Sequence, residues 1–477
     1  SSPRKRGPML PGSNMGPRFR GDDDGVGDDD RVARVLLVGV STRALAESAV
    51  GAGYEVLSVD GYGDLDNPAS PALSLARDFG VEYTAHAAAA AAAGLELDYD
   101  AVCYGSSLEN HPRDVALLAS RAELWGNPPA VLRRARNAVA LSRLLRSRLG
   151  AGALVRASAG DSSREWLMKP RASGGGHDIT EWHSGSALPR THVLQERIDG
   201  TPGSIAFVAH DGDSVPFAIS RQLVGDTRFA ASAFQYCGSI LSSCPGSVID
   251  AATDSAHLLA EELDLTGLAC LDFVVSRDGI PHAIELNPRY SASMELAERA
   301  FGYSVFAAHA RACARRGNHR SARFSHHPDE RFTHLPAKRP TDHPAAPLPR
   351  LDLAASLRSV GALGKAVLFA PTTLVMPDTR PWLTDPDVRD IPHPGETIPR
   401  GHPVCTIFAT ARDDSACYEM LVRKAGEMYE EMKESREQKA ESSEDPRVHG
   451  YRVQGSGFRV QGLPGGRDLD SEVVPEP

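Results

Sequence analysis

The sequence lacks the features expected of a membrane-spanning, secreted or disulfide-bonded protein. No apolar run approaches the roughly 18 residues that a membrane-spanning helix needs. The first 30 residues contain no apolar core of a signal peptide. The seven cysteines are scattered and form no CxxC pair, which indicates reduced thiols. We therefore expect a cytoplasmic protein without a membrane partner.

The sequence also lacks an excess of positive charge. It has 52 Lys and Arg residues against 62 Asp and Glu residues, which gives a net charge of −10. This balance provides no global attraction to nucleic acid or to an anionic membrane, so we expect neither as a partner. The contents of 41% hydrophobic and 24% charged residues are ordinary for a globular protein, and 477 residues are enough for two to four domains.

Composition and apolar patterning divide the chain into two polar tails, three folded segments and a linker. One tail mixes Pro, Gly, Arg and an acidic run, and the other repeats a short unit in YRVQGSGFRVQG, so both are predicted to be disordered. The linker is rich in histidine, but the spacing matches no standard zinc site. The predicted divisions are a tail (1–31), a first domain (32–130), a second domain (131–318), the linker (319–350), a small third domain (351–432) and a second tail (433–477).

The first folded segment alternates between strand and helix patterns. Residues 34–40 (RVLLVGV) form a continuous apolar run bounded by glycine, which is typical of a buried parallel strand. A helical pattern with a glycine stop follows, and YEVLSVD and YDAVCYGS are two further strand patterns. This alternation predicts a doubly wound parallel α/β sheet. The second segment shows alternating apolar runs instead, which predict an antiparallel sheet and an α+β arrangement.

The stretch GLACLDFVVSRDGIPHAIELNPR contains the strongest chemical pattern. Asp278 and Gly279 separate two apolar runs and predict a hairpin turn. If these two residues form the turn, Asp272 and Glu285 lie directly opposite on one face, and Asn287 shares it. Opposed carboxylates repel unless a cation neutralises them, and carboxylate and amide oxygens suit Mg²⁺. A solvated edge hairpin is the alternative, but the apolar surroundings favour a metal site.

Two basic side chains and a glycine-rich loop complete a candidate phosphate site. Lys169 ends a predicted strand, where it can place a point charge on nucleotide phosphates. Arg289 follows the acidic strand and can reach a transferring phosphoryl group or an oxyanion, or else pair with Glu295 at the surface. A glycine-rich loop can cover phosphates with its backbone N–H groups, although a linker would have the same composition. The loop residues are Ser173, Gly174, Gly175 and Gly176.

Other polar residues are weaker candidates. Glu196 and Asp199 lie at a predicted strand end and hinge, where they can meet a nucleoside, but an ordinary hairpin explains them equally well. Arg221 is a cation in an apolar strand and requires an anion, either a ligand or a structural ion pair. Ligands of open α/β sheets bind beyond the carboxyl ends of the strands. The polar residues there are candidates for a substrate pocket: Ser41, Thr42, Arg43, Ser106, Glu109 and Asn110.

Together these motifs resemble those of the ATP-grasp superfamily. The resemblance rests on Lys169, the SGGGHD loop, QERIDG, Asp272 and IELNPR, and it extends over about 32–430 of the chain. GVSTRALAESA, GSSLENHP and ELNPRYSASME most resemble a group of predicted ATP-dependent carboligases related to biotin carboxylase, and tyramine–glutamate ligase is a more distant likeness. The resemblance implies a Rossmann-like pre-ATP-grasp domain, an ATP-grasp domain and a small, β-rich C-terminal domain.

The resemblance also implies how the nucleotide would be held. Lys169 would bind the α- and β-phosphates of ATP. Many members carry an earlier lysine on the helix that opens the ATP-grasp region, and Arg136 is the candidate for its place here. Glu196 and the backbone near Ile198 would meet the adenine, and Asp199 would meet the ribose.

The implied chemistry is the activation of a carboxylate by ATP. Asp272, Glu285 and Asn287 would hold Mg²⁺, or Mn²⁺ in its place. Arg289 would stabilise the acyl-phosphate chemistry, and Arg221 would orient the acceptor carboxylate. These roles imply an enzyme, an amide-forming carboxylate–amine ligase acting on a small amino-acid or cofactor-precursor substrate. Because relatives are often dimers, a homodimer is compatible with the resemblance.

Two other functions fit the same residues. One is carboxylation through carboxyphosphate, as in biotin carboxylase; the chain has no biotin-carrier segment with a Met-Lys-Met centre, so a carrier would be a separate chain. The other is a regulatory protein that binds ATP without turnover. The intact set of Asp272, Glu285, Asn287 and Arg289 argues against that alternative.

Overall fold

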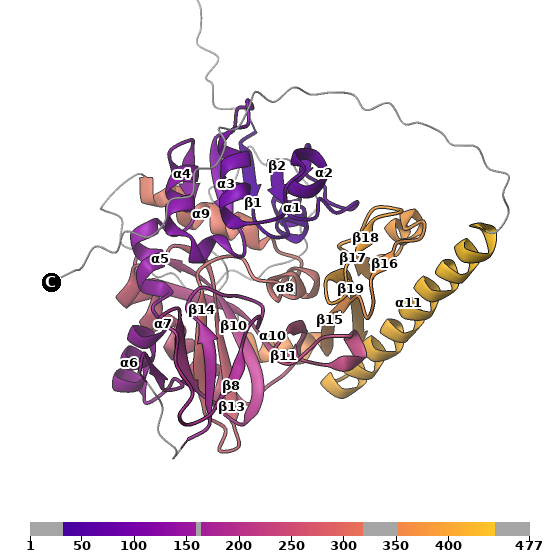
Figure 1. Cartoon of the computed structure of the whole chain (residues 1–477). Helices are drawn as coiled ribbons and strands as arrows, with labels where there is room; N and C mark the ends of the chain where they lie inside the picture. Colours follow the sequence, from indigo (N-terminus) through magenta and orange to yellow (C-terminus); the bar gives the residue numbers. More distant parts are fainter. Residues whose placement is uncertain (1–31, 159–163, 318–351, 444–477) are drawn as a thin grey trace, which may run out of the picture.

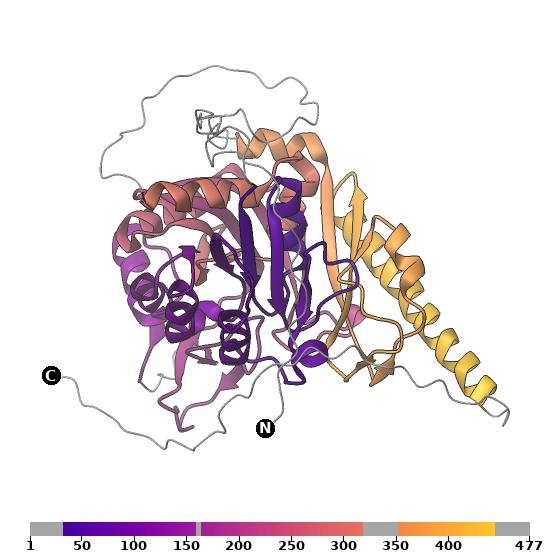
Figure 2. The same cartoon turned by 90° about the horizontal axis from the view of Figure 1, so that it is seen from above.

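The structure is a computed structural model that describes residues 32–158, 164–317 and 352–443. It contains two large sheets with helices packed between them, and a smaller sheet at one edge (Figures 1 and 2). The predicted first tail (1–31), the whole of the predicted histidine-rich linker (319–350) and the part of the predicted second tail from residue 444 lie outside the described residues. No helix in the described ranges is long and apolar enough to cross a membrane.

The first sheet is parallel and has five strands in the order β3-β2-β1-β4-β5. This confirms the predicted doubly wound arrangement. Its central strand is completely buried from Val35 to Val38, as the continuous apolar run predicts. The strands are β1 (Arg34–Val38), β2 (Glu55–Asp60), β3 (Ala72–Ser74), β4 (Ala101–Tyr104) and β5 (Glu123–Trp125).

Helices cover both faces of the first sheet and form two apolar clusters with it. One helix consists almost entirely of alanine, and its short side chains pack against the sheet at Ala88, Ala89 and Ala92. The helices of this domain are α1 (Arg43–Gly51), α2 (Leu75–Phe79), α3 (Ala85–Ala93) and α4 (Pro112–Ala119), with a 3₁₀ turn η2 (Leu108–Asn110) before α4.

The second sheet is antiparallel and has eight strands in the order β14-β13-β10-β11-β12-β15-β19-β17. The predicted second and third domains therefore share one continuous sheet, although the third contributes its own apolar cluster. The join is the pairing of β12 with β15. The strands are β10 (Gly200–His210), β11 (Asp213–Val224), β12 (Tyr236–Leu241), β13 (Gly267–Ser276), β14 (Pro281–Asn287), β15 (Ala362–Phe369), β17 (Val388–Arg389) and β19 (Pro403–Ala411).

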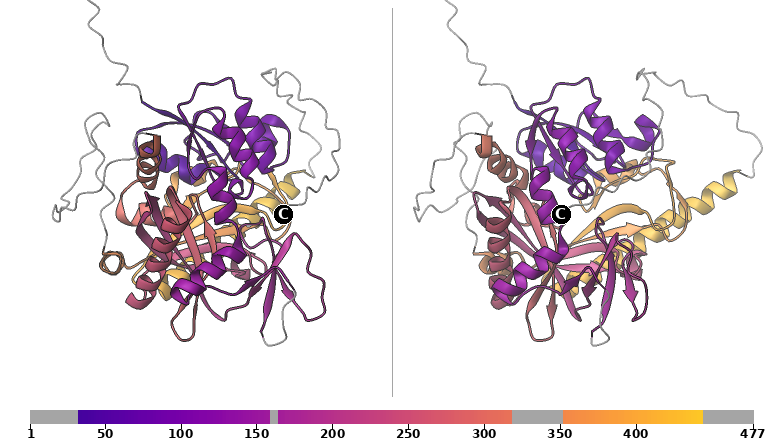
Figure 3. Two further views of the ribbon diagram at one scale, coloured as in Figure 1. Left: turned by 90° about the vertical axis from the view of Figure 1, so that its left-hand side faces the viewer. Right: turned by 60° about the vertical axis from the view of Figure 1, so that its left-hand side comes forward.

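A smaller four-stranded sheet, in the order β6-β9-β7-β8, stands at one edge of the second domain (magenta, Figure 3). The sequence patterns predict two of its strands, β7 and β9, but not the two shorter ones. The strands are β6 (Val155–Arg156), β7 (Trp166–Pro170), β8 (Thr180–Trp182) and β9 (His192–Glu196). A two-stranded ribbon of β16 (Leu374–Val375) and β18 (Thr397–Ile398) lies in the third domain.

Helices on the second sheet connect it to the first domain. Phe306 of α9 packs against Tyr54 and Trp125 of the first domain, with ring centroids 5.2 and 6.1 Å away. The helices that follow the first domain are α5 (Pro129–Ala135), α6 (Ala138–Leu149), α7 (Gly246–Leu263), α8 (Met294–Phe301), α9 (Val305–Gly317), α10 (Leu353–Val360) and α11 (Asp414–Ser443).

The last helix corrects the predicted start of the C-terminal tail. Helix α11 runs along the outer side of β15 and β19 (yellow, Figure 1) and continues to Ser443, whereas the composition predicts a disordered tail from residue 433. The extension KESREQKAESS contains many Lys, Glu, Gln, Arg and Ala residues, which are good helix formers. Composition alone cannot distinguish such a polar helix from a polar tail.

Glu298 of α8 joins the second domain to α1 and gives the protein a predicted pH dependence. It accepts hydrogen bonds from the Ser48 hydroxyl and from the Val305 backbone N–H at 2.8 Å. Burial raises the pKa of Glu298 from 4.5 to about 7. The carboxyl group of Glu298 therefore holds its proton more tightly in the folded protein than in the unfolded chain. The stability that this group contributes declines as the pH rises from 4.5 to about 7.

We expect Glu298→Gln to be more stable than the wild type at pH 8 and nearly equal at pH 5. The gain is up to about 3 kcal/mol, because the amide keeps an acceptor oxygen and removes a buried charge. Thermal unfolding at the two pH values measures the difference. The exposed Glu82→Gln variant is the control. A gain that is the same at both pH values would contradict the assignment.

Candidate active site

The predicted acidic pair is confirmed, although the hairpin that forms it differs from the prediction. Asp272 of β13 pairs directly with Glu285 of β14. The turn has three residues rather than two, because the Ser276 backbone N–H donates to the Ile280 carbonyl at 3.0 Å. A β-bulge at Ile284 then adds one residue to β14 and restores the expected register. Without the bulge, Glu285 would face the opposite side of the sheet.

Asp272 is the centre of a hydrogen-bonded group on the sheet face. The Asn287 side-chain amide donates to one of its oxygens at 2.9 Å, and the Gln222 amide donates to the other at 2.8 Å. Burial and the neighbouring Glu285 raise the pKa of Asp272 to about 7. A divalent cation would counteract both the burial of Asp272 and its repulsion from Glu285, because it supplies positive charge to the carboxylate pair.

The oxygen atoms of Asp272, Glu285 and Asn287 suit a hard divalent cation whose coordination shell is completed by oxygens of a bound ligand. In the described ranges, no three His, Cys, Asp or Glu side chains are arranged to hold a metal ion. The protein ligands here would be the two carboxylates and the Asn287 amide oxygen. Magnesium commonly binds few protein carboxylates and completes its shell with water and phosphate oxygens. The residues therefore fit Mg²⁺ best when it arrives with a phosphate ligand.

Glu285 faces the two basic residues predicted to bind the nucleotide. Its carboxylate lies 2.8 Å from the Arg136 guanidinium. Although burial alone would raise the pKa of Glu285, the charges of Arg136 and Lys169 lower it below its usual value. Lys169 of β7 donates to the side-chain oxygen of Gln195 at 3.0 Å, and the Gln195 amide donates to the bulged Ile284 carbonyl at 2.8 Å. Gln195 thus holds Lys169 beside the acidic strand.

Arg289 reaches the same face and is held from the first domain. Both its Nε and its Nη2 lie 2.9 Å from a carboxylate oxygen of Glu109, a completely buried residue of η2. Its Nη1 donates to the Tyr290 carbonyl at 2.9 Å, and its Nη2 donates to the Asn287 side-chain oxygen at 3.3 Å. Glu109, a candidate for substrate binding, instead fixes the orientation of the arginine predicted to act in catalysis.

The glycine-rich loop is docked on the start of β12. The Gly175 carbonyl accepts from the Tyr236 backbone N–H at 3.1 Å. Gly176 has φ +80°, and a Cβ added there would lie 1.8 Å from the Phe234 carbonyl oxygen. Glycine is therefore required at 176 for close backbone approach. The Ser173 carbonyl at the other end of the loop accepts from Arg136 at 2.8 Å.

Replacing Gly176 by Ala is expected to weaken Mg²⁺–ADP binding about tenfold, because the left-handed backbone alone costs an alanine about 1–2 kcal/mol and the loop must leave β12. The melting temperature should change little, since the loop contributes few side chains to the hydrophobic core. Titration with a fluorescent ADP analogue measures the affinity. Gly174→Ala is the matched control, because its Cβ would meet nothing within 4 Å. Equal affinities of the two variants would show that loop docking is irrelevant to nucleotide binding.

The residues predicted to meet the nucleoside lie at the edge of the small sheet. The Glu196 carboxylate pairs with Arg164 and accepts from the Leu154 backbone N–H at 3.3 Å. Ile198 and Asp199 occupy the segment between β9 and β10, and the Asp199 side chain is exposed. Their roles in adenine and ribose binding stay predictions.

The structure does not bring Arg221 to the candidate site. Side chains alternate along a strand, and Gln222, not Arg221, shares the face of Asp272. Arg221 points to the other face, where it binds Asp414 of α11 at 2.7 Å and lies over the Tyr418 ring. The alternative of a structural ion pair therefore describes Arg221, and its predicted role in orienting a carboxylate is corrected. The period of two in the strand places Arg221 and Gln222 on opposite faces, but it does not say which of them faces Asp272.

The polar residues predicted to form a substrate pocket divide into buried and accessible groups. Arg43 is completely buried and pairs with Glu295 and Asp390, and Thr42 donates to Asp60 at 2.6 Å. These contacts correct the expectation that Thr42 and Arg43 contact substrate, because fully enclosed groups with protein partners have no free surface for it. The members that retain some exposure are Ser41, Ser106 and Asn110.

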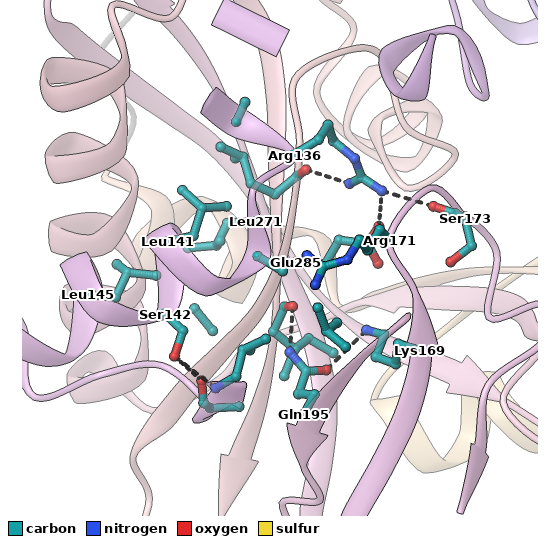
Figure 4. A pocket seen from close by; sticks show the side chains of 18 of the residues that line it. Arg136, Leu141, Ser142, Leu145, Lys169, Arg171, Ser173, Gln195, Leu271 and Glu285 are labelled. Carbon is teal, nitrogen blue, oxygen red and sulfur yellow. Dashed lines mark hydrogen bonds and ion pairs between the residues drawn. The ribbon is translucent and has the colours of Figure 1, made fainter. Parts of the chain in front are cut away.

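A cavity lies between α6, the small sheet and β14 (Figure 4). Its walls carry Arg136, Lys169, Ser173, Gln195 and Glu285, together with apolar residues of α6. Its volume is about 50 Å³, whereas ligand pockets commonly exceed about 300 Å³. This cavity is therefore smaller than a typical ligand pocket.

Comparisons with known proteins agree with this arrangement. Residues 152–293 match the model of the ATP-grasp domain family. No curated protein sequence matches the chain.

Several solved structures share the fold at low sequence identity. An L-amino acid ligase from Bacillus licheniformis is 13% identical with a TM-score of 0.57, covering 83% of this chain and 98% of its own. A carboxyaminoimidazole ribonucleotide synthase from Aspergillus clavatus, complexed with ATP, is 14% identical with a TM-score of 0.56, covering 84% and 99%. The biotin carboxylase domain of the 2-oxoglutarate carboxylase from Hydrogenobacter thermophilus, solved with MgADP and bicarbonate, is 14% identical with a TM-score of 0.55, covering 82% and 88%. Residues 152–293 thus match an ATP-grasp domain, and the chain shares the fold of these three solved structures.

Proposed function

We propose that the protein is an ATP-dependent carboxylate–amine ligase that forms an amide bond on a small amino-acid or cofactor-precursor substrate. The observation that carries this proposal is the face on which Asp272, Glu285 and Asn287 meet Lys169 and Arg289. Acidic ligands for a metal, a lysine for phosphates and an oriented guanidinium are the groups that phosphoryl transfer to a carboxylate requires.

The residues divide the chemistry between them. Asp272, Glu285 and Asn287 would hold Mg²⁺, which when bound neutralises phosphate charge. Lys169 would bind the phosphates and Arg289 the developing negative charge. A substrate carboxylate oxygen attacks the γ-phosphorus and ADP leaves. The amine nitrogen then attacks the acyl carbon, the bond to phosphate breaks, and the amine loses a proton. Once it covers the bound nucleotide, the glycine loop would exclude water, which otherwise hydrolyses the acyl phosphate.

The L-amino acid ligase supports this chemistry among proteins of the same fold. The biotin carboxylase domain, whose structure contains bicarbonate, supports carboxylation as the second candidate. Both chemistries use an activated carboxylate-like species, so the fold does not separate them. A protein that binds ATP without turnover is the third candidate.

A coupled assay of ADP release with Mg²⁺–ATP tests the three functions. Pools of carboxylates and amines are supplied separately, together and with bicarbonate. ADP release that needs both a carboxylate and an amine supports the ligase. Release that depends on bicarbonate without an amine supports carboxylation. ATP binding without release under any pool supports the regulatory protein.

A further inference from the structure

Arg136 lies at a break between two helices. The sequence VLRRARNAVALSRLL reads as one helical stretch, but α5 ends at Ala135 and α6 begins at Ala138. Asn137 caps α6, since its side-chain oxygen accepts from the Ala140 backbone N–H at 3.2 Å. The break places Arg136 outside both helices, so its side chain extends into the cavity (Figure 4).

The guanidinium of Arg136 binds four groups from three parts of the protein. Its Nε donates to the Asn110 side chain of the first domain at 2.8 Å, and its Nη1 donates to the Leu286 carbonyl of β14 at 2.9 Å. Its Nη2 lies 2.8 Å from the Ser173 carbonyl of the glycine loop and 2.8 Å from the Glu285 carboxylate. One side chain thus connects the first domain, the loop and the candidate metal ligand.

The same contacts place Arg136 in competition with a metal ion. Glu285 shares its oxygens between the guanidinium and any cation bound beside Asp272. A divalent cation that takes the Glu285 oxygen removes the strongest contact that holds Arg136 in place. Arg136 and Glu285 also line the same small cavity.

We propose that Arg136 is a positioning residue that couples metal binding to the glycine loop. In the metal-free protein it is the counter-ion of Glu285 and anchors the loop through the Ser173 carbonyl. A divalent cation at Glu285 displaces it, and the Ser173 carbonyl then keeps only the longer hydrogen bond from the Asn110 amide, at 3.3 Å, so this end of the loop is loosened. This proposal rests on the proposed function only for the location of the metal site.

An arginine is required for this coupling. The planar guanidinium presents donors in several directions at once, and here they reach four acceptors. A lysine ammonium at the same place is a point charge on a flexible chain, so it can neutralise Glu285 without anchoring the loop as well.

Amide hydrogen exchange of the nucleotide-free protein tests the anchor. Peptides covering residues 171–178 and 234–238 report on the loop, because the Tyr236 N–H is bonded to the Gly175 carbonyl. We expect about tenfold faster exchange in both peptides for Arg136→Ala, and an intermediate rate for Arg136→Lys. Arg134→Ala is the matched control, since Arg134 lies two residues away on α5 and, within the described part of the chain, its side chain donates only to the Leu263 carbonyl.

Electron paramagnetic resonance of Mn²⁺ tests the competition. The affinity of the nucleotide-free protein for Mn²⁺ should rise several-fold in Arg136→Ala and stay unchanged in Arg134→Ala. Saturating Mn²⁺ should accelerate loop exchange in the wild type but not in Arg136→Ala, whose loop is already loosened. A merely structural role for Arg136 would leave Mn²⁺ affinity equal or lower it.

The outcomes separate the two proposals. If Mn²⁺ binds, but the loop exchange rate and the Mn²⁺ affinity are the same in the wild type and in Arg136→Ala, the coupling is overturned. The metal site then stands. Absence of Mn²⁺ binding in both the wild type and Arg136→Ala, with ADP as well as without it, would overturn the metal site, and the coupling with it. Faster loop exchange together with tighter Mn²⁺ binding in Arg136→Ala alone would support the coupling.

Discussion

Replacing Glu285 by Gln is expected to lower substrate-dependent ADP formation about a thousandfold or more. The substitution keeps the shape of the side chain but removes one of two negative charges that face the cation. It also leaves Arg136 and Lys169 without the carboxylate whose pKa they lower. The rate of ADP release at fixed pH, with the substrate pool that gives the highest wild-type activity, measures the effect.

The control for this prediction is Glu181→Gln, which removes an exposed carboxylate from the neighbouring β8. That variant should retain wild-type activity. Asp272→Asn should resemble Glu285→Gln, because the two carboxylates face each other across one strand pair. Activity of Glu285→Gln within tenfold of the wild type would mean that the metal is not held at this face.

Replacing Glu295 by Ala is expected to destabilise the folded protein by about 3–5 kcal/mol, the usual cost of removing one partner of a buried ion pair. Glu295 is 4% exposed and binds two cations, Arg43 and Lys365, each at 2.5 Å. Those cations lower the pKa of Glu295 well below its usual value. Without the carboxylate, a buried lysine loses its anion and a completely buried arginine retains only its other carboxylate partners.

The matched control is Glu47→Ala, since Glu47 binds the same Arg43 guanidinium at 2.9 Å but is half exposed. Its loss should cost less than about 1 kcal/mol, as exposed ion pairs do. Urea unfolding followed by fluorescence compares the two variants. Because Arg43, Glu295 and Lys365 belong to three different segments, we expect Glu295→Ala to lose cooperativity between the domains as well. Equal stabilities of the two variants would contradict the assignment of Glu295 as the buried link.

The sequence predicted the local features of the candidate site. The acidic pair and Asn287 share one face because side chains in a strand alternate with a period of two, and Lys169 lies at the end of a strand pattern. The prediction that Asp272 faces Glu285 is correct, although it assumes a two-residue turn and the structure has a three-residue turn. The longer turn and the bulge at Ile284 shift the register in opposite directions, and neither leaves a clear mark in the sequence.

Side-chain partners were less predictable than strand positions. Arg221 and Gln222 are adjacent, so only one of them can face Asp272, and the sequence does not say which face is turned inward. Arg43 looked like a ligand-binding residue at a strand end, but its partner Glu295 lies 252 residues away in sequence. Such pairs depend on how whole domains pack, which local patterning does not encode.

By itself, the sequence therefore determined the parallel first sheet, the antiparallel hairpin with its carboxylates, and the glycine loop, because each follows from short-range periodicity and backbone sterics. Only the tertiary structure decided what those residues contact: that Glu109 holds Arg289, that the third segment extends the second sheet, and that Arg136 connects Asn110, Ser173 and Glu285. These contacts join residues far apart in the chain, and they exist only once the domains are packed against one another.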